Sequence, residues 1–190
     1  HTFQSAATNG VTVYPAQCRL TTIEKRSGSK SLKLDSGAYL SYALSTIPAF
    51  GTSDFTIEMW IRPTTAMNTT KYLLDMRTSG ASEVNSPSLY IDSGNLKYKI
   101  NGSDVITGAH GMSANTWYHV ALTRTSQILK AWVNGSQVGS DYSDTNTYRE
   151  RKITIGAEWN GSSNYVGYID NFVIYGGESK YTTSFTPSTL

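Results

Sequence analysis

The stretch Asn115–Gly139, NTWYHVALTRTSQILKAWVNGSQVG, determines the fold prediction. In two segments of it, residues 117–123 and 128–133, side chains of different polarity alternate with period two. Such alternation, with many β-branched and aromatic residues, is typical of half-buried β-strands. The Asn134-Gly135 pair that follows is a strong signal for a tight hairpin turn. The stretch therefore predicts two strands and the start of a third.

The register of the first hairpin depends on the length of its turn. An even number of turn residues around Thr125-Ser126 pairs Leu122 with Leu129, whereas an odd number pairs Leu122 with Lys130. A slip of one residue moves every side chain to the other face of the sheet, so the even turn is preferred. The second face then carries Trp117, Lys130, and His119 opposite Trp132.

Similar patterns recur along most of the chain. Further strands are expected at residues 11–14, 32–34, 39–42, 55–62, 71–76, 89–92, 95–100, 152–156 and 166–175. Three polar loops without periodicity separate some of them, at Arg77–Ser88, Ser140–Glu150 and Ala157–Tyr165. We found no helical period, so the fold class is all-β, a two-sheet antiparallel β-sandwich of the jelly-roll kind. We expect residues 29–190 to form this domain and residues 1–28 to form an N-terminal arm or edge strands.

Composition excludes several classes of protein. The net charge of the 190-residue chain is only +2, and its Lys and Arg residues are scattered without a basic stripe, so we expect no nucleic-acid partner. The single cysteine, Cys18, excludes an internal disulfide, and no apolar run is long enough for membrane insertion. The three His residues lack zinc-ligand spacing. Because the chain starts at His1, we read it as a piece of something longer.

Catalytic patterns are also missing. Glycoside hydrolases need two carboxylates on either side of one sugar bond. The acidic residues near the expected strands are isolated in sequence: Glu58, Asp75, Asp92 and Asp170. There is no Gly-x-Ser-x-Gly nucleophile motif either. We therefore predict that the chain is not an enzyme.

The long loops are the predicted ligand-binding regions, because aromatic rings stack on sugars and amides read their hydroxyls. The candidate residues are Glu83, Asn85, Tyr142, Asn146, Tyr148, Trp159, Asn160 and Tyr165. Trp159 is the strongest candidate, and the alternative is that it covers the edge of the sandwich. His119 either lines a ligand surface with Trp117 and Trp132 or is a covered, hydrogen-bonded structural residue, and we prefer the structural reading. Asp170 either binds calcium or holds neighbouring backbone N–H groups, and we prefer the second role because a buried carboxylate needs partners.

Five segments together resemble the laminin G-like modules, which have a concanavalin A-like jelly-roll fold. The segments are FTIEMWIRP, TWYHVALTR, LKAWVNGSQVG, ITIG and GYIDNFVIY. The tail KYTTSFTPST is similar to versions of the module in virion proteins of tailed phages. The resemblance implies binding of carbohydrate or protein at an outer surface, without catalysis.

The resemblance also implies calcium as a possible cofactor, held at the rim of the sandwich by aspartates from two loops. At one of these positions the chain has Ser86-Pro87-Ser88 instead of an aspartate. Asp141 and Asp144 are the remaining candidate ligands, and the alternative is that they are solvated turn residues.

The preferred function is a non-enzymatic surface module of a virion, on the capsid, neck or tail, that attaches to host glycans or proteins. One alternative is a structural decoration domain whose residues 1–26 dock on a neighbouring virion subunit. Another is an extracellular bacterial adhesin, or a carbohydrate-binding accessory domain of a secreted enzyme. The expected partner is a glycan or a virion protein, and oligomerisation within a particle is left open.

Overall fold

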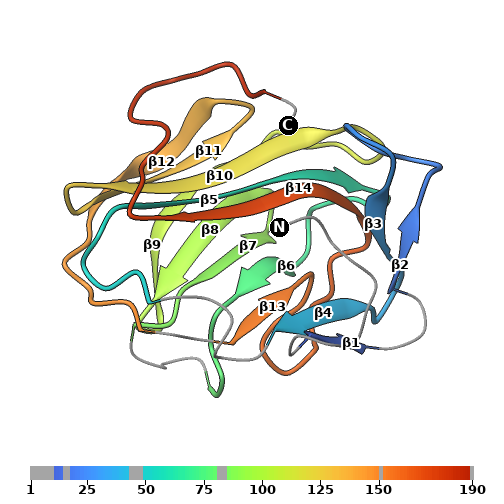
Figure 1. The fold of residues 1–190 in the computed structure, drawn as a ribbon, viewed down its shortest axis with the longest axis horizontal. Helices are drawn as coiled ribbons and strands as arrows, with labels where there is room; N and C mark the ends of the chain where they lie inside the picture. Colours follow the sequence, from blue (N-terminus) through green and yellow to red (C-terminus); the bar gives the residue numbers. More distant parts are fainter. Residues whose placement is uncertain (1–10, 15–17, 43–48, 81–84, 150–151, 189–190) are drawn as a thin grey trace.

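The computed structural model describes residues 11–14, 18–42, 49–80, 85–149 and 152–188. These residues form two seven-stranded antiparallel sheets that pack face to face (Figure 1). The prediction of an all-β sandwich is therefore confirmed. The described part of the chain contains no helix, and so none that could cross a membrane.

The first sheet, drawn below the other in Figure 1, has the strand order β1-β4-β13-β6-β7-β8-β9. Its strands are β1 (Val11–Tyr14), β4 (Tyr39–Tyr42), β6 (Lys71–Asp75), β7 (Ser88–Asp92), β8 (Asn95–Ile100), β9 (Ser103–Ala109) and β13 (Ile153–Ile155). The second sheet has the order β12-β11-β10-β5-β14-β3-β2. Its strands are β2 (Cys18–Thr21), β3 (Ser31–Leu34), β5 (Phe55–Pro63), β10 (Tyr118–Thr125), β11 (Ile128–Val133), β12 (Ser136–Ser143) and β14 (Gly167–Gly176).

The central hairpin has the predicted faces but a different register. The turn is even, with two residues, Ser126 and Gln127, at positive φ of 47° and 67°. Leu122 consequently lies opposite Ala131 rather than Leu129. The prediction that His119 lies opposite Trp132 is wrong, because Trp132 pairs with Ala121. A shift of two residues keeps every side chain on its predicted face, so the burial pattern alone could not distinguish the two registers.

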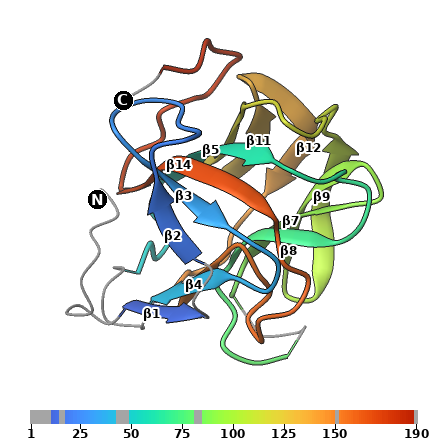
Figure 2. The same ribbon diagram turned by 90° about the vertical axis from the view of Figure 1, so that its right-hand side faces the viewer.

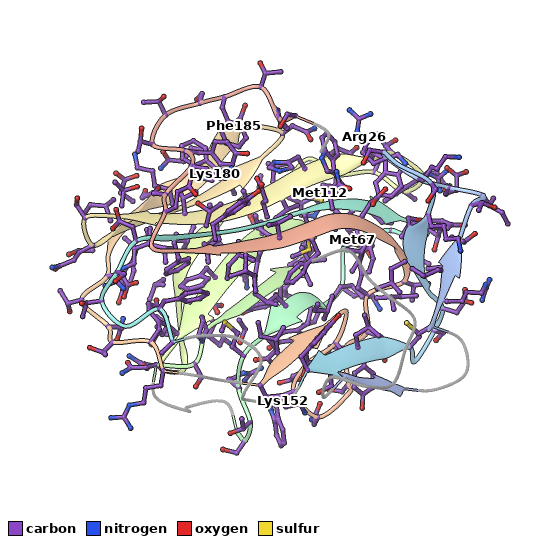
Figure 3. All side chains as sticks on the ribbon, viewed as in Figure 1. Arg26, Met67, Met112, Lys152, Lys180 and Phe185 are labelled. Carbon is purple, nitrogen blue, oxygen red and sulfur yellow. The ribbon has the colours of Figure 1, made fainter. Side chains whose placement is uncertain are left out.

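The core lies between the sheets and is built by alternate residues of each strand. On β5 the inward-facing side chains of Phe55, Ile57, Met59 and Ile61 are almost completely buried. The outward-facing Glu58 and Trp60 are also buried, because other segments cover that face of the second sheet. Figure 3 shows Met67 and Met112, two further core residues, in the space between the layers.

One end of the sandwich is closed where β9 of the first sheet meets β12 of the second, and both views place these strands side by side (Figures 1 and 2). Gly108 and Gly139 make the approach possible. A Cβ atom on Gly108 would lie 2.5 Å from the backbone nitrogen of Gly139, and one on Gly139 would lie 2.9 Å from the carbonyl oxygen of Thr107. The two glycines therefore allow backbone-to-backbone contact between the sheets.

Candidate functional site

The loop that carries Trp159 lies on the outer face of the first sheet and is tied to it by a buried carboxylate. Asp75, the last residue of β6, is completely buried. Its Oδ2 atom accepts a hydrogen bond of 2.9 Å from the backbone N–H of Trp159. Asp75 also accepts a hydrogen bond from the Ser88 hydroxyl, at 3.1 Å. The backbone at Trp159 is thereby fixed to the sheet.

Arg77 completes this attachment, and we call Asp75, Arg77 and Glu158 together the anchor. Its guanidinium binds Asp75 through Nε and Nη2, at 2.6 Å for the shortest contact, and binds Glu158 at 3.0 Å. Burial opposes the charge of Arg77, but the hydrogen bonds and charges of its partners raise its pKa above the usual range. Arg77 also lies over the ring of Tyr72, 5.4 Å from its centroid. Asp75 and Glu158 are therefore held in a fixed arrangement on either side of the Arg77 guanidinium.

The loop is also closed on itself and on its surroundings. The Ser162 hydroxyl donates to Glu158 at 2.9 Å, and the N–H of Gly161 donates to the carbonyl of Glu158 at 2.8 Å. A Cβ on Gly161 would lie 2.9 Å from the ring of Tyr39, so this glycine lets the loop rest on β4. Lys152, at the lower edge of the molecule in Figure 3, donates to the Trp159 carbonyl at 3.2 Å. The half-buried indole of Trp159 and the exposed Asn160 are thus presented by a pinned loop.

Three tyrosines of the predicted site lie inside the domain or against it. Tyr148 and Tyr165 are at most 1% exposed. The Tyr148 hydroxyl donates to Asp144 at 2.7 Å, and the Tyr165 hydroxyl donates to the Tyr168 carbonyl at 3.1 Å. Burial raises the pKa of both hydroxyls. Tyr142 is half-buried against the core, on β12, which extends into the stretch that the sequence suggested was a loop. Tyr148 and Tyr165 therefore have no surface to offer a ligand.

Two predicted amide residues meet at one rim. The Asn101 side chain bridges them, because its Oδ1 accepts from the Asn85 N–H at 2.6 Å and its Nδ2 donates to Asn146 Oδ1 at 2.9 Å. This cluster belongs to other loops than the one carrying Trp159 and Asn160. Glu83 lies outside the described residues.

The two candidate metal ligands point to opposite sides of the second sheet. Asp141 is half exposed and pairs with Lys130 at 3.3 Å on the outer face. Asp144 is completely buried, and its Oδ2 lies 3.3 Å from Nε of Arg124, an inward-facing residue of β10. Its other oxygen, Oδ1, accepts two hydrogen bonds from Asn146. Within the described ranges, no group of three or more His, Cys, Asp or Glu residues is placed to hold a metal ion.

His119 is covered, and the cover is the C-terminal segment Gly177–Ser188, which we call the strap. In Figure 1 the strap runs above the second sheet, and Figure 3 places Lys180 and Phe185 there. The Phe185 ring packs edge-on against His119 and Trp132, with centroids 5.7 and 5.6 Å apart. The N–H of Phe185 donates to the Gly135 carbonyl at 3.1 Å. These contacts agree with the structural reading of His119.

A carboxylate connects the strap to the sheet beneath it. Glu58 Oε2 lies 3.2 Å from Nε2 of His119 and accepts the hydroxyl of Tyr181, a strap residue, at 2.7 Å. Burial opposes ionisation of Glu58, but these two hydrogen bonds outweigh burial and lower its pKa below the usual 4.5. The Tyr181 and Phe185 rings stack with a centroid separation of 3.5 Å. Sequence alone missed this cluster, since nothing local signals that the tail returns to the sheet.

The carboxylates near the strands all have internal partners. Asp170 accepts hydrogen bonds from the backbone N–H groups of Arg26, Ser27 and Asn171, in agreement with the preferred reading. The others are Glu58 with His119, Asp75 with Arg77, and Asp92 with Lys97. Each of these groups therefore has a structural role in the described part of the chain.

The strand order, the two packed layers and the loops at their rims define a concanavalin A-like domain. The family model described as the concanavalin A-like lectin/glucanases superfamily, of the laminin G group, matches residues 35–180, and the chain belongs to this family. No curated protein sequence matches the chain.

Solved structures with the same fold share little sequence with the chain. The binding domain of botulinum neurotoxin serotype D is 18% identical with a TM-score of 0.66; the match covers 88% of this chain and 43% of the toxin domain. The cellulose-induced protein Cip1 is 17% identical with a TM-score of 0.60, covering 91% of this chain and 89% of Cip1. A sialidase CBM40 from Ruminococcus gnavus, bound to α2,3-sialyllactose, is 16% identical with a TM-score of 0.54, covering 70% and 80%. The chain thus spans less than half of the toxin domain.

Proposed function

We propose that the domain is a non-enzymatic saccharide-binding module whose primary contact is the loop carrying Trp159. The observation that supports this most directly is the anchor at Asp75. It fixes the backbone of Trp159, whose indole is half-buried. An aromatic platform that is already rigid loses little conformational entropy when a sugar stacks on it. Asn160, exposed beside the indole, supplies an amide that can exchange hydrogen bonds with sugar hydroxyls.

Two solved structures with the same fold contain saccharides, which is consistent with this proposal. The CBM40 is bound to sialyllactose, and a domain of an arabinanase from Geobacillus stearothermophilus is in complex with arabinotriose. These ligands belong to those proteins, and at identities of 16–17% the likeness to this chain shows the shared fold alone.

The test is a glycan array probed with the parent and with Trp159→Ala. We expect the variant to keep its melting temperature and to lose about tenfold or more in affinity, since loss of a stacking ring corresponds to at least ~1.4 kcal/mol. Tyr175→Ala is the control, because Tyr175 is also a half-buried aromatic residue but lies on β14 of the second sheet, where Lys180 contacts its ring. A stable Trp159→Ala protein that binds every array glycan as well as the parent would refute the proposal.

We propose the surface of a tailed-phage particle as the setting, with attachment to host glycans or proteins as the role. The support is the likeness of the tail, residues 180–189, to virion versions of the module. A decoration domain docked through residues 1–26 and a secreted bacterial adhesin are the competing settings. Immunogold labelling of purified particles separates the virion settings from the secreted one: label on particles supports the virion settings, and label confined to secreted protein removes them.

A further inference from the structure

The outer face of the second sheet carries a row of cations and aromatic rings that the sequence does not reveal. Arg19, Lys33, Tyr168 and Arg62 lie directly opposite one another on β2, β3, β14 and β5. Trp117, the residue before β10, extends the row beside Arg62, because the next residue, Tyr118, pairs with Ile61 of β5. Neighbouring strands are about 4.8 Å apart, so the row spans roughly 19 Å.

The side chains of the row contact one another. Nζ of Lys33 is 4.5 Å from the centroid of the Tyr168 ring, and the Arg62 guanidinium carbon is 5.6 Å from it. The Trp117 and Tyr168 rings are tilted, with centroids 6.5 Å apart. Beside the row, the guanidinium of Arg26 lies 4.1 Å above the Trp60 ring. Cations and rings therefore form one continuous surface next to the strap, whose Ser188 carbonyl accepts the Trp60 indole N–H.

This surface is more positive than the rest of the chain. Its cations, on the row and on the loop between β2 and β3, are Arg19, Lys25, Arg26, Lys30, Lys33 and Arg62. Its carboxylates are Glu24, Asp35 and Asp170. The six cations exceed the three carboxylates by three, which is more than the net charge of +2 of the whole chain. Asp35 is shared by Arg19 and Lys33, and Glu24 pairs with Arg62 at 3.4 Å, so exposed cations remain on the loop.

We propose that this surface is a second binding site, specific for an acidic polysaccharide whose carboxylates contact the exposed cations beside the row, Lys25, Arg26 and Lys30. Arginine presents a planar fork that matches a carboxylate, and lysine adds a point charge. The half-buried Trp117 at the end of the row supplies an apolar ring for the sugar itself. Lys33 and Arg62 both contact the Tyr168 ring, which argues against stacking of a nucleic-acid base on that ring. This site is on the opposite sheet from the loop of Trp159 and does not depend on it.

The probe is polygalacturonate, compared with the same polymer after reduction of its carboxyl groups, by calorimetry at low and high salt. The variant, which we call the row variant, is Lys25→Gln/Lys30→Gln on the loop beside the row, and Lys97→Gln/Lys99→Gln on the first sheet is the charge-matched control. We expect the row variant to bind polygalacturonate about tenfold more weakly, as two partly exposed ion contacts imply. The control and Trp159→Ala should bind as the parent does, and salt should weaken parental binding. Unchanged melting temperatures show that both double variants are folded.

Three results would overturn the proposal. The first is equal loss in the row variant and in the charge-matched control, since net charge would then explain the binding. The second is equal binding of the carboxyl-reduced polymer. The third is tighter binding of duplex DNA or of phosphatidylserine vesicles than of polygalacturonate. If instead Trp159→Ala abolishes all saccharide binding while the row variant binds normally, the primary site stands and only the second site fails.

Discussion

Replacing Gly135 by alanine should separate the strap from the second sheet. Gly135 occupies the β11–β12 turn at φ +77°, and a Cβ atom there would lie 1.7 Å from the carbonyl oxygen of Phe185. The obstructing atom belongs to the strap backbone, so rotation of a side chain cannot relieve the overlap. The strap must therefore move away from the turn.

Gly94 provides a matched control for the conformational part of the effect. It sits in a hairpin turn of the first sheet at φ +76°, next to Ser93 at φ +50°, much as Gly135 follows Asn134 at φ +49°. A Cβ on Gly94 meets nothing within 4 Å. Alanine costs about 1–2 kcal/mol in this left-handed conformation at either position. The difference in the free energy of unfolding between the two variants consequently isolates the contribution of the strap.

The size of that difference follows from the contacts of Phe185. Exposing its half-buried ring costs about 1–2 kcal/mol, and losing its edge contacts with His119 and Trp132 costs about 0.5–1.5 kcal/mol. We expect Gly135→Ala to be about 2–3 kcal/mol less stable than Gly94→Ala, or roughly 4–12 °C lower in melting temperature for a chain of this size.

Urea denaturation measures the free energies, and chymotrypsin reports on the strap through cleavage after Tyr181 or Phe185. Cleavage should be faster in Gly135→Ala than in Gly94→Ala. Equal free energies of unfolding together with equal cleavage rates would refute the docking of the strap on this turn.

Three further predictions concern buried carboxylates. The folded-state pKa of Glu58 is lowered, so its ionisation stabilises the protein above its unfolded pKa of about 4.5, and this contribution is lost as the pH falls through the lower folded value. Glu58→Gln should therefore reduce the loss of stability between about pH 5 and pH 3, measured by urea denaturation, and an unchanged pH profile would contradict the role of the cluster. Asp75→Asn should destabilise the domain by about 3 kcal/mol, because Arg77 then keeps only Glu158. Asp92→Asn, at a partly exposed pair, should cost about 0–1 kcal/mol, and similar losses in the two variants would argue against the anchor. Asp170→Ala should lower the melting temperature equally with and without calcium, and a calcium-dependent shift seen in the parent alone would restore the metal-binding reading.

Period-two alternation predicted the strands and their faces well, because burial acts on each strand separately. It placed Trp132 and His119 on the outer face of the central hairpin, where the structure has them. It could not choose between even registers, because a shift of two residues preserves the alternation. The pairing of Leu122 with Ala131 depends on the two-residue turn at positive φ.

The loops were harder to predict because their composition does not report burial. Tyr148 and Tyr165 lie in polar stretches that look exposed, yet both enter the core, where their hydroxyls find buried partners. The anchor of Trp159 required Asp75 to meet a backbone N–H that is 84 residues away in sequence. The scattered basic residues likewise form a row only once the order of strands is known, and no local pattern encodes that order. Sequence therefore identified Trp159 as a candidate but not the residues that hold it.

The close approach of β9 and β12 through Gly108 and Gly139 has a consequence for association. β9 and β12 are the edge strands of their sheets, and at that end they shield each other's unpaired backbone N–H and C=O groups. Among the described strands, β1 and β2 are the outermost at the other end of each sheet. An incoming chain that pairs by backbone hydrogen bonds is thereby directed to the N-terminal strands, and fibre-like stacking of copies through β9 or β12 is obstructed.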